Sequence, residues 1–293
     1  MRIVLVGAVD FSQSALERLI GIDANVVGVV TLESSTFNAD HRDLGPVAEE
    51  HGIPFVYAPD VNSDASIAWI ADKELQVVFC FGWSGLLKSQ ILKLAPLGVV
   101  GSHPTAPPAN RGRHPLIWAL ALGLPETAST FFFMEEGADD GDILSQATIE
   151  IAPTDDAASL YAKVTEAALA QIEAFVPRLA AGDFSRMPQD HRRSNTWRKR
   201  GKSDGHIDWR MSSATIHNLV RALTKPYVGS HFMHGDEEVK VWRTEVVTGV
   251  APNIEPGRVA DVTDFGPVVK CGEEAIRLIQ IEPAVTLFAG EYL

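Results

Sequence analysis

The chain has 293 residues, a length typical of about two domains. Hydrophobic residues make up 46 % of the chain and charged residues 22 %, which excludes disorder as its main state. Lys and Arg total 25 against 38 Asp and Glu, and the formal charge of −13 argues against a protein whose main task is binding nucleic-acid phosphates.

Short, continuous apolar runs alternate with helical patterns in the first third of the chain. The expected strands are Arg2–Ala8, Asn25–Thr31, Pro54–Tyr57, Gln76–Phe81 and Gly98–Gly101. The expected helices between them are Ser12–Ile20, Val47–His51, Ala65–Lys73 and Leu86–Leu94. Continuous apolar strands in this order predict a parallel sheet covered on both faces, and such sheets carry active sites beyond the carboxyl ends of their strands.

Further helices and strands follow, and the amino-acid composition changes near residue 190. The expected order is a helix Leu116–Leu122, a strand Ser129–Met134, its hairpin partner Ile143–Ile151 and a long helix Ala157–Ala181. The stretch Arg186–Lys202 holds seven Lys or Arg and is interpreted as a linker. After a helix at Ser213–Leu223, the expected strands are Ser230–Met233, Glu238–Arg243, Gly257–Thr263, Pro267–Lys270 and Ala275–Ile281. They predict a small barrel or an open sheet.

The fold class is therefore α/β, a Rossmann-like, mostly parallel sheet with a smaller, mainly β, OB-like C-terminal domain. We expect a catalytic domain over 1–190, a linker over 191–205 and the C-terminal domain over 206–293. Cys80 and Cys271 cannot form a disulfide framework, and the chain starts without a basic segment, so we expect a cytoplasmic protein. No apolar run approaches the ~20 residues of a membrane span.

The first strand-to-helix turn lacks a phosphate-binding motif. Gly7 is its only glycine, so neither the G-x-G-x-x-G fingerprint nor the G-x-x-x-x-G-K-[ST] loop is present. This absence argues against a nicotinamide dehydrogenase and against a P-loop nucleoside triphosphatase.

A proline-rich loop follows the fifth expected strand. Gly98–Trp118 reads GVVGSHPTAPPANRGRHPLIW, and such a stiff loop at a strand end can fix a polar side chain. His103 is that side chain, and an imidazole can take a proton from an attacking nucleophile. The alternative is a structural histidine.

An acidic turn follows the strand at Ser129–Met134. Glu135–Leu144 reads EEGADDGDIL, and one of its carboxylates could orient an imidazole and stabilise its charged form. A solvated acidic turn is the alternative. The turn lacks the alternating ligands and closing Glu of a calcium loop, and His231 and His234 have no further ligands nearby in sequence, so we expect no metal.

Together the two stretches resemble the 10-formyltetrahydrofolate-dependent formyltransferase family, whose motif is N-x-H, then a segment ending in R-G-x-x-P, then D-x-G-D. The matching residues are His103, Pro108, Arg111–Gly112, Pro115 and Asp140–Asp142. The resemblance implies the formyltransferase fold, N10-formyltetrahydrofolate as formyl donor, His103 as catalytic base and Asp142 as its partner. It also implies a homodimer.

One position departs from the family pattern. Gly101 stands where the family has an asparagine that donates a hydrogen bond to the formyl oxygen. Loss of such a donor typically costs ~10²–10³ in rate. Ser102, Thr105 or Asn110, or backbone N–H groups, could supply it, and the remaining alternative is a weak or inactive relative that binds folate or a nucleotide sugar.

The resemblance also assigns binding residues. The folate would lie against the strand-end loop and the acidic loop, and its expected contacts are Phe81, Gly82, Trp83, Leu86, Ala138 and Asp139. The expected substrate contacts are Thr105, Asn110, Arg111 and Gly112, although Arg111 could equally clamp its own loop. Arg111 or Arg113 could also meet phosphates.

The amine acceptor is expected to be an amino sugar, most simply a nucleotide-linked one. The tRNA-acting relatives carry a basic insertion where this chain has Leu32–Gly45, in which acidic residues outnumber a single arginine. The segment Leu219–Gly229 is similar to the amino-sugar enzymes. The basic cluster over 192–202 is interpreted as a solvated linker, or as cations that meet a diphosphate. A methionyl-tRNA formyltransferase is the alternative that this cluster would favour.

Overall fold

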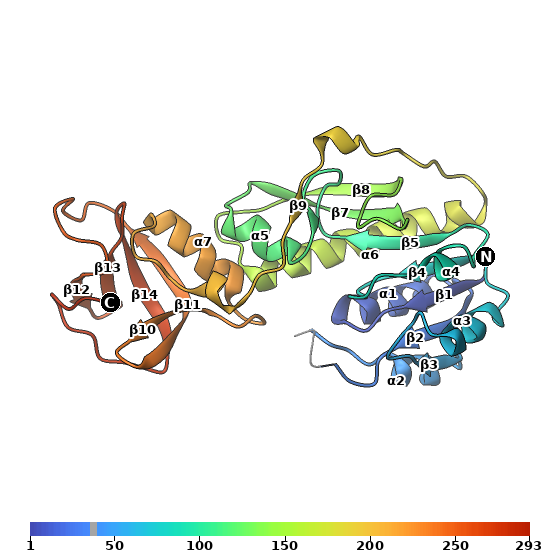
Figure 1. The fold of residues 1–293 in the computed structure, drawn as a ribbon, viewed down its shortest axis with the longest axis horizontal. Helices are drawn as coiled ribbons and strands as arrows, with labels where there is room; N and C mark the ends of the chain where they lie inside the picture. The colour runs from blue at the N-terminus through green and yellow to red at the C-terminus, as the bar shows by residue number, and fades with distance from the viewer. Residues whose placement is uncertain (36–39) are drawn as a thin grey trace. The chain divides into compact units, whose positions relative to one another are not determined.

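The computed structural model describes residues 1–35 and 40–293. Its N-terminal part is built on a seven-stranded sheet, whose strands can be followed in Figure 1. The strand order is β3 (Phe55–Tyr57), β2 (Val26–Thr31), β1 (Ile3–Val6), β4 (Val77–Cys80), β5 (Val99–His103), β7 (Glu126–Phe133), β8 (Ile143–Glu150). The first five strands pair in parallel, and β7 runs antiparallel to β5. The predicted mostly parallel sheet is thus confirmed.

Helices cover both faces of this sheet. They are α1 (Asp10–Gly21), α2 (Gly45–Glu50), α3 (Asp64–Ala71), α4 (Ser89–Leu92) and α6 (Ala157–Ala180), whereas α5 (Pro115–Ala121) belongs to the second compact unit described below. Side chains of α1 and α6 form one core cluster with Val100, whereas side chains of α3 and α4 form another with Val99. Because neighbouring residues of a strand point to opposite faces, Gly101 and His103 share the face of Val99, and Ser102 shares the face of Val100.

The turn between β1 and α1 is closed by its own side chains. Ser12 Oγ donates to the carbonyl of Phe81 at 2.5 Å and accepts from the N–H of Val9 at 3.1 Å. A Cβ added at Gly7 would lie 2.5 Å from Ser12 Oγ. The hydroxyl therefore fills the space that phosphate-binding turns leave open, in agreement with the missing glycine motif.

One predicted helix is shorter than expected. The pattern over Leu86–Leu94 yields only α4, because the residues before it are held in place by Asn62. The Asn62 side chain donates to the carbonyl of Leu86 at 2.9 Å and accepts from the N–H of Lys88 at 2.7 Å. The Asn62 amide thus forms hydrogen bonds with backbone groups that belong to the first turn of the expected helix.

A small parallel pairing was not predicted. β6 (Arg111–Gly112) pairs with β9 (Thr196–Trp197), so part of the expected linker joins the proline-rich loop. Two 3₁₀ turns, η1 (His191–Arg193) and η2 (Lys202–Gly205), lie on either side of β9. Two-residue strands give no periodicity that a sequence pattern could reveal.

The C-terminal part is an antiparallel sheet with one helix. The strand order is β10 (Ser230–His234), β11 (Glu237–Val247), β14 (Ala275–Glu282), β13 (Gly266–Lys270), β12 (Val259–Thr263), preceded by α7 (Ser213–Leu223). Ser212 caps α7 by accepting from the N–H of Thr215 at 3.1 Å. The pairings among the described residues leave β10 and β12 as edges, so this mainly β domain is an open sheet.

By packing, the chain forms two compact units. Unit 1 comprises 1–112, 127–149 and 162–197, and unit 2 comprises 113–126, 150–161 and 198–293. The expected boundaries at 190 and 206 stay a prediction. Residues 36–39 of the segment Leu32–Gly45 lie outside the described residues. Within the described ranges, no helix is both long and apolar enough to cross a membrane.

Candidate active site

His103 is the last residue of β5, at the carboxyl edge of the parallel strands, and is only 8 % exposed. Its Nε2 lies 3.3 Å from the carbonyl oxygen of Asn110, and its Nδ1 lies 3.8 Å from Oδ2 of Asp139. Burial lowers the pKa of His103, whereas Asp139 and the Asn110 carbonyl oppose that shift. The imidazole is therefore neutral at neutral pH, the state that a general base requires.

The carboxylate that faces His103 belongs to Asp139, which corrects the expected pairing with Asp142. Asp139 has a φ of 55°, in the left-handed region, and its Oδ2 also accepts from the N–H of Gly112 at 3.0 Å. Asp142 directly precedes β8, and its backbone carbonyl accepts from the N–H of Phe133 at 2.8 Å. The sequence motif DDGD does not reveal this difference, because the turn geometry decides which carboxylate points at the imidazole.

Gly112 and Asn110 hold the loop in this position by their backbones. Gly112 has a φ of 102°, and a Cβ there would lie 2.9 Å from Cγ2 of Thr196, so no other residue fits the pairing with β9. The N–H of Asn110 donates to Oδ1 of Asn195 at 2.8 Å. These two expected substrate contacts therefore position His103 and Asp139.

Arg111 is built into the loop rather than presented to a substrate. It is 8 % exposed; its Nη2 donates to Oε1 of Gln189 at 2.5 Å and lies 3.2 Å from Nδ1 of His191. The sequence left two roles open for Arg111, a contact to the substrate or a clamp of its own loop. These contacts favour the clamp.

Gln189 is the residue that sequence reasoning missed. It is 6 % exposed and follows the long helix, far from either motif. Its Nε2 donates to the carbonyl of Asp139 at 3.0 Å and to that of Gly141 at 2.7 Å, while its Oε1 accepts from Arg111. One side chain thus joins the acidic loop to the proline-rich loop. No local pattern marks it, since its partners lie 48, 50 and 78 residues away.

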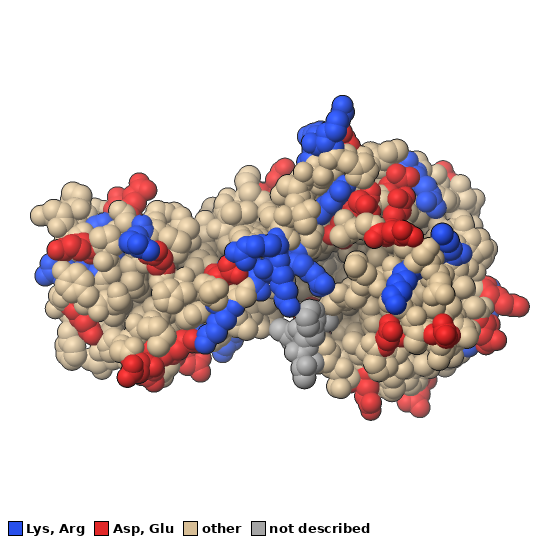
Figure 2. All heavy atoms as spheres, in the orientation of Figure 1, with Lys and Arg blue, Asp and Glu red and all other residues tan. Residues whose placement is uncertain are grey.

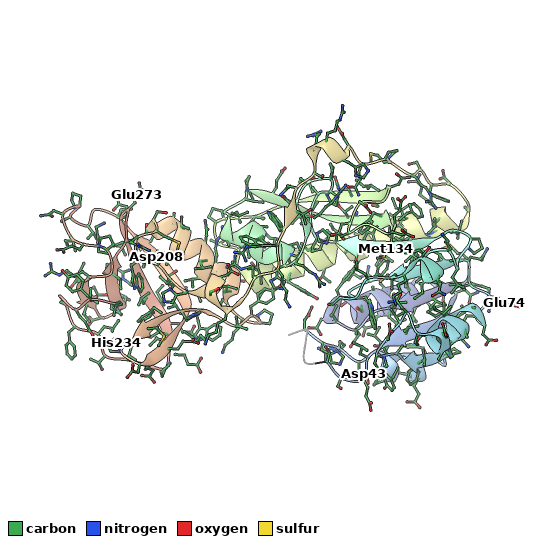
Figure 3. All side chains as sticks on the ribbon, in the orientation of Figure 1. Asp43, Glu74, Met134, Asp208, His234 and Glu273 are labelled. Carbon is green, nitrogen blue, oxygen red and sulfur yellow. The ribbon has the colours of Figure 1, made fainter. Side chains whose placement is uncertain are left out.

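The family asparagine position is filled differently here. A Cβ added at Gly101 would lie 2.8 Å from Cγ and 3.0 Å from Sδ of Met134, whose N–H donates to the carbonyl of Val99 at 2.7 Å. Met134, labelled in Figure 3, therefore occupies the space that a longer side chain at 101 would need, as the distances from an added Cβ show. Ser102 points to the opposite face from His103 and is not placed to replace that side chain.

Thr105 carries an unpaired polar atom close to His103 in sequence. It is 1 % exposed, and its Oγ1 has no hydrogen-bond partner among the described residues. Its backbone is fixed, because the carbonyl accepts from Oγ1 of Thr130 at 2.7 Å. A buried hydroxyl without a partner is costly, and a ligand oxygen would satisfy it.

The expected folate contacts fall into two groups. Phe81 is a core residue, fully buried and stacked on Phe79 at 5.1 Å between ring centroids, with both backbone groups bonded within the fold. Its side chain faces the core, and the expected folate contact at Phe81 stays a prediction. Gly82, with a φ of 70°, and Trp83 are partly buried, whereas Leu86 and Ala138 are exposed.

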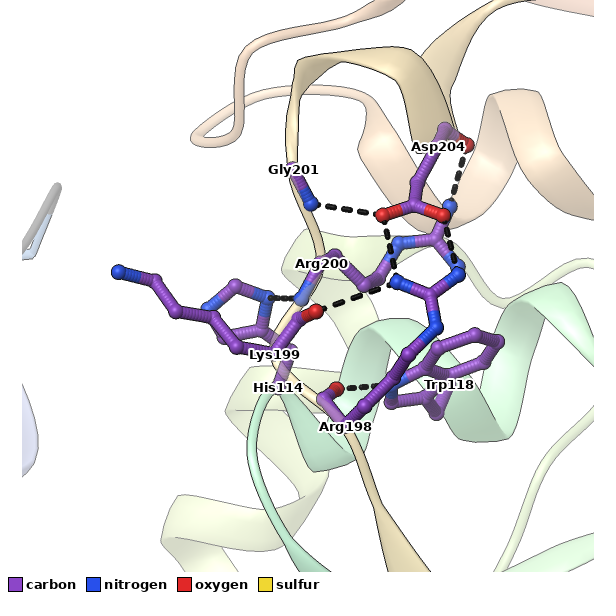
Figure 4. Close-up of polar contacts among 7 residues, drawn as sticks. All are labelled: His114, Trp118, Arg198, Lys199, Arg200, Gly201 and Asp204. Carbon is purple, nitrogen blue, oxygen red and sulfur yellow. Dashed lines mark hydrogen bonds and ion pairs between the residues drawn. The ribbon is translucent and has the colours of Figure 1, made fainter.

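The basic stretch after β9 is largely exposed, and several of its side chains are held by hydrogen bonds and by an indole ring (Figure 4). The guanidinium of Arg198 donates to both carboxylate oxygens of Asp204 at 2.8 and 2.5 Å, and that of Arg200 donates to the Asp204 carbonyl at 2.6 Å. Both guanidinium groups lie over the Trp118 ring, at 5.4 and 4.6 Å from its centroid. The indole Nε1 in turn donates to the carbonyl of Arg198 at 3.0 Å. Cations are thus held close together on one indole.

Neither metal chemistry nor thiol chemistry is indicated by the described side chains. No group of three His, Cys, Asp or Glu among them could hold a metal ion. Burial raises the pKa of Cys80 to about 12, and that of Cys271 also to about 12, so neither thiol is reactive at neutral pH.

Comparison with family models identifies both halves of the chain. Residues 1–175 match the model described as "Formyl transferase", and residues 199–286 match "Formyl transferase, C-terminal domain".

Solved structures share the fold at low sequence identity. An N-formyltransferase from Helicobacter canadensis, in complex with folinic acid and dTDP-3-aminofucose, has a TM-score of 0.72 at 15 % identity, over 94 % of this chain and 98 % of its own. WlaRD, a sugar 3N-formyl transferase, has a TM-score of 0.68 at 14 % sequence identity, and the match covers 97 % of this chain and 99 % of WlaRD. HypX from Aquifex aeolicus, in complex with tetrahydrofolic acid, has a TM-score of 0.69 at 18 % sequence identity, and this chain spans only 44 % of the length of HypX.

Proposed function

The chain belongs to the formyl transferase family, and on that premise we propose that it transfers the formyl group of N10-formyltetrahydrofolate to the primary amine of a nucleotide-linked amino sugar. The observation that carries the proposal is the pairing of the buried His103 with the partly buried Asp139 at the carboxyl end of β5. This edge is where doubly wound sheets bind their ligands.

His103 acts as the general base. An amine attacks a carbonyl carbon only through its free lone pair, and the neutral imidazole takes the proton that the amine loses as the new C–N bond forms. Asp139 orients the ring and stabilises the imidazolium, which then returns the proton to the departing nitrogen. Bound N10-formyltetrahydrofolate would supply the formyl group.

The residues present fit such a formyl donor. The buried, unpartnered hydroxyl of Thr105 can donate to an oxygen that gains negative charge. Ala138, beside Asp139, is exposed and open to a ligand on the acidic loop. Thr105 therefore replaces the donor that Gly101 cannot provide.

The amino-sugar assignment rests on charge and on chain length. An N-formyltransferase in complex with dTDP-3-aminofucose and a sugar 3N-formyl transferase match almost all of this chain with almost all of their own length. A charge of −13 opposes the many phosphate contacts of a tRNA complex. We therefore favour a small anionic substrate. A homodimer and a cytoplasmic location accompany this proposal as predictions.

The test is a panel of nucleotide-linked amino sugars incubated with N10-formyltetrahydrofolate, in which release of tetrahydrofolate and formylation of the sugar are both measured. We expect turnover with at least one sugar and its loss in His103→Ala. Ligand binding without turnover on the whole panel would support a non-catalytic relative instead, and turnover unchanged in His103→Ala would remove the histidine from the mechanism.

A further inference from the structure

We propose that Met134 is a specificity-determining residue, which keeps water away from the formyl group so that the bound formyl donor reacts with an amine and is not hydrolysed. The inference rests on the proposed function for the formyl donor and for His103 as the base. It goes further by giving a task to a side chain that lies outside both sequence motifs.

A neutral histidine beside a formyl donor can also promote hydrolysis. The pKa of His103 is lowered by burial, and a base that takes a proton from an amine can take one from water. The water oxygen would then bond to the formyl carbon, the bond from this carbon to N10 would break, and N10 would take the proton. The products would be formate and tetrahydrofolate. Since water is far more abundant than any sugar substrate, it has to be excluded from the face of β5 that carries His103.

Met134 lies on that face of the sheet. Gly101 and His103 are two residues apart in β5, so they face the same side at a spacing of about 6.6 Å along the strand. A Cβ added at Gly101 would lie 2.8 Å from Cγ and 3.0 Å from Sδ of Met134. The thioether therefore covers Gly101, one step along the strand from the imidazole.

The other neighbours of Gly101 are apolar and buried. Cys80 of β4 and Phe132 of β7 are in register with Gly101, and both are buried. Met134 packs against the core cluster that contains Cys80 and Val99, but it is only partly buried. Of these three neighbours, Met134 is the one that reaches the surface. Its side chain thus lies between an apolar floor and the solvent.

The backbone fixes Met134 at the start of the acidic loop. Its N–H donates to the carbonyl of Val99 at 2.7 Å, which continues the pairing of β7 with β5. The next residues, Glu135 and Glu136, are exposed, and Figure 2 shows red side chains gathered over the part of the sheet where Figure 1 labels β7 and β8. Carboxylates are strongly hydrated, so Met134 separates a water-rich surface from His103.

Shortening this side chain should let water reach the imidazole. Met134→Ala removes Cγ, Sδ and Cε and leaves a space over Gly101. A water occupies such a space only where polar groups can bond to it. His103 lies on this face, with Asp139 at 3.8 Å from its Nδ1, so these two groups can hold a water beside the formyl carbon.

The experiment measures the formate that the full chain releases from N10-formyltetrahydrofolate when no amine is present. We expect Met134→Ala to release formate at least tenfold faster than the unmodified protein. Met134→Leu keeps most of the volume and should be much slower than Met134→Ala. The matched control is Met211→Ala, the same change at a partly buried methionine of unit 2, which should leave the rate unchanged.

The double variant His103→Ala/Met134→Ala shows whether water uses the same base, and its formate release should fall well below that of Met134→Ala. Release that persists in the double variant, or equal rates in Met134→Ala and Met211→Ala, would overturn the inference. Urea unfolding checks that each variant folds. If Met134→Ala does not, Met134→Val takes its place and should release formate faster than Met134→Leu, and equal rates in these two would overturn the inference as well.

Binding of tetrahydrofolate, measured by calorimetry, separates this inference from the proposed function. Neither binding nor formate release requires an amino sugar. Failure of the unmodified protein to bind tetrahydrofolate would contradict the proposed function and this inference together. Binding with unchanged formate release in Met134→Ala would contradict this inference alone. Faster release in that variant, without transfer to any amino sugar, would support the role of Met134 and remove the amino-sugar assignment.

Discussion

At the scale of single residues, the candidate chemistry depends on which carboxylate faces His103. The imidazole is buried, so a charge placed next to it acts through little solvent and has a large effect. Asp139 is 3.8 Å away and fixed by the N–H of Gly112. We therefore propose Asp139, rather than Asp142, as the orienting carboxylate.

Replacing Asp139 should reduce kcat far more than replacing Asp142. We expect Asp139→Asn to lose roughly 10²–10⁴-fold, the range typical of acid–base partners, because the imidazolium loses its counter-charge. Asp142→Asn keeps the backbone carbonyl that bonds to Phe133 and serves as the matched control. The measurement is kcat for formyl transfer, and a larger loss in the Asp142 variant would reverse the assignment.

The pH dependence should report the lowered pKa of His103. Since burial favours the neutral ring, kcat/KM should rise with pH below ~6.5 and be level above it. Asp139 acts to raise this pKa, so Asp139→Asn should move the acidic limb to still lower pH. A limb that moves to higher pH in the variant would contradict this electrostatic description.

The hydroxyl of Thr105 should matter for rate but not for folding. Thr105→Val keeps the shape and removes a buried, unpartnered polar atom, so the unfolding free energy should stay equal or rise. We expect kcat to fall ~10²–10³-fold, as for other oxyanion donors. Ser102→Ala, on the opposite face of β5, is the comparison in steady-state kinetics and urea unfolding. A full loss in Ser102→Ala alone would identify Ser102 as the donor instead.

At the scale of elements, two loops and the segment after α6 are joined by one buried amide. Gln189 donates to two carbonyls of the acidic loop and accepts from Arg111. Both loops carry members of the His103–Asp139 pair, so a shift of either loop changes the distance between imidazole and carboxylate.

Substituting Gln189 should therefore separate stability from positioning. Gln189→Met removes all three bonds, and we expect ~10²-fold lower kcat together with a loss of roughly 1–3 kcal/mol in unfolding free energy. Gln189→Glu keeps the acceptor for Arg111 but has no N–H to donate to the two carbonyls of the acidic loop. Compared with Gln189→Met, it should therefore recover more of the unfolding free energy than of kcat. Equal recovery of both in this variant would reduce Gln189 to a purely structural residue.

At the scale of the whole molecule, the sheet core sets the stability on which the site depends. The rings of Phe79, Phe81, Phe131 and Phe175 contact one another under α1 and α6 at centroid distances of 4.9–6.0 Å. Phe81 directly precedes Gly82 of the expected folate loop, so the core and that loop share one chain segment.

A core substitution should reveal this dependence. Phe131→Ala leaves a cavity in a fully buried cluster, and we expect a loss of ~3–5 kcal/mol in unfolding free energy. Phe265→Ala makes the same change at a side chain that is 77 % exposed and should stay within about 0.5 kcal/mol. Urea unfolding measures both, and similar losses in the two variants would contradict the described core.

The sequence by itself determined the elements and the histidine. Continuous apolar runs and helical spacing are local properties, so α1, α3, α6, α7 and most strands of the two larger sheets lie close to their expected bounds, and His103 lies at a strand end. The family motif added the fold and the expected reaction.

Only the tertiary structure decided which side chains meet. The choice of Asp139 over Asp142 depends on a turn with positive φ, the burial of Arg111 depends on Gln189, and Met134 fills the space beside Gly101. The basic cluster at Arg198 and its neighbours is ordered by Trp118, 80 residues away. Such contacts join residues far apart in the chain, and no local periodicity records them, because their free energy comes from burial and hydrogen bonding between elements.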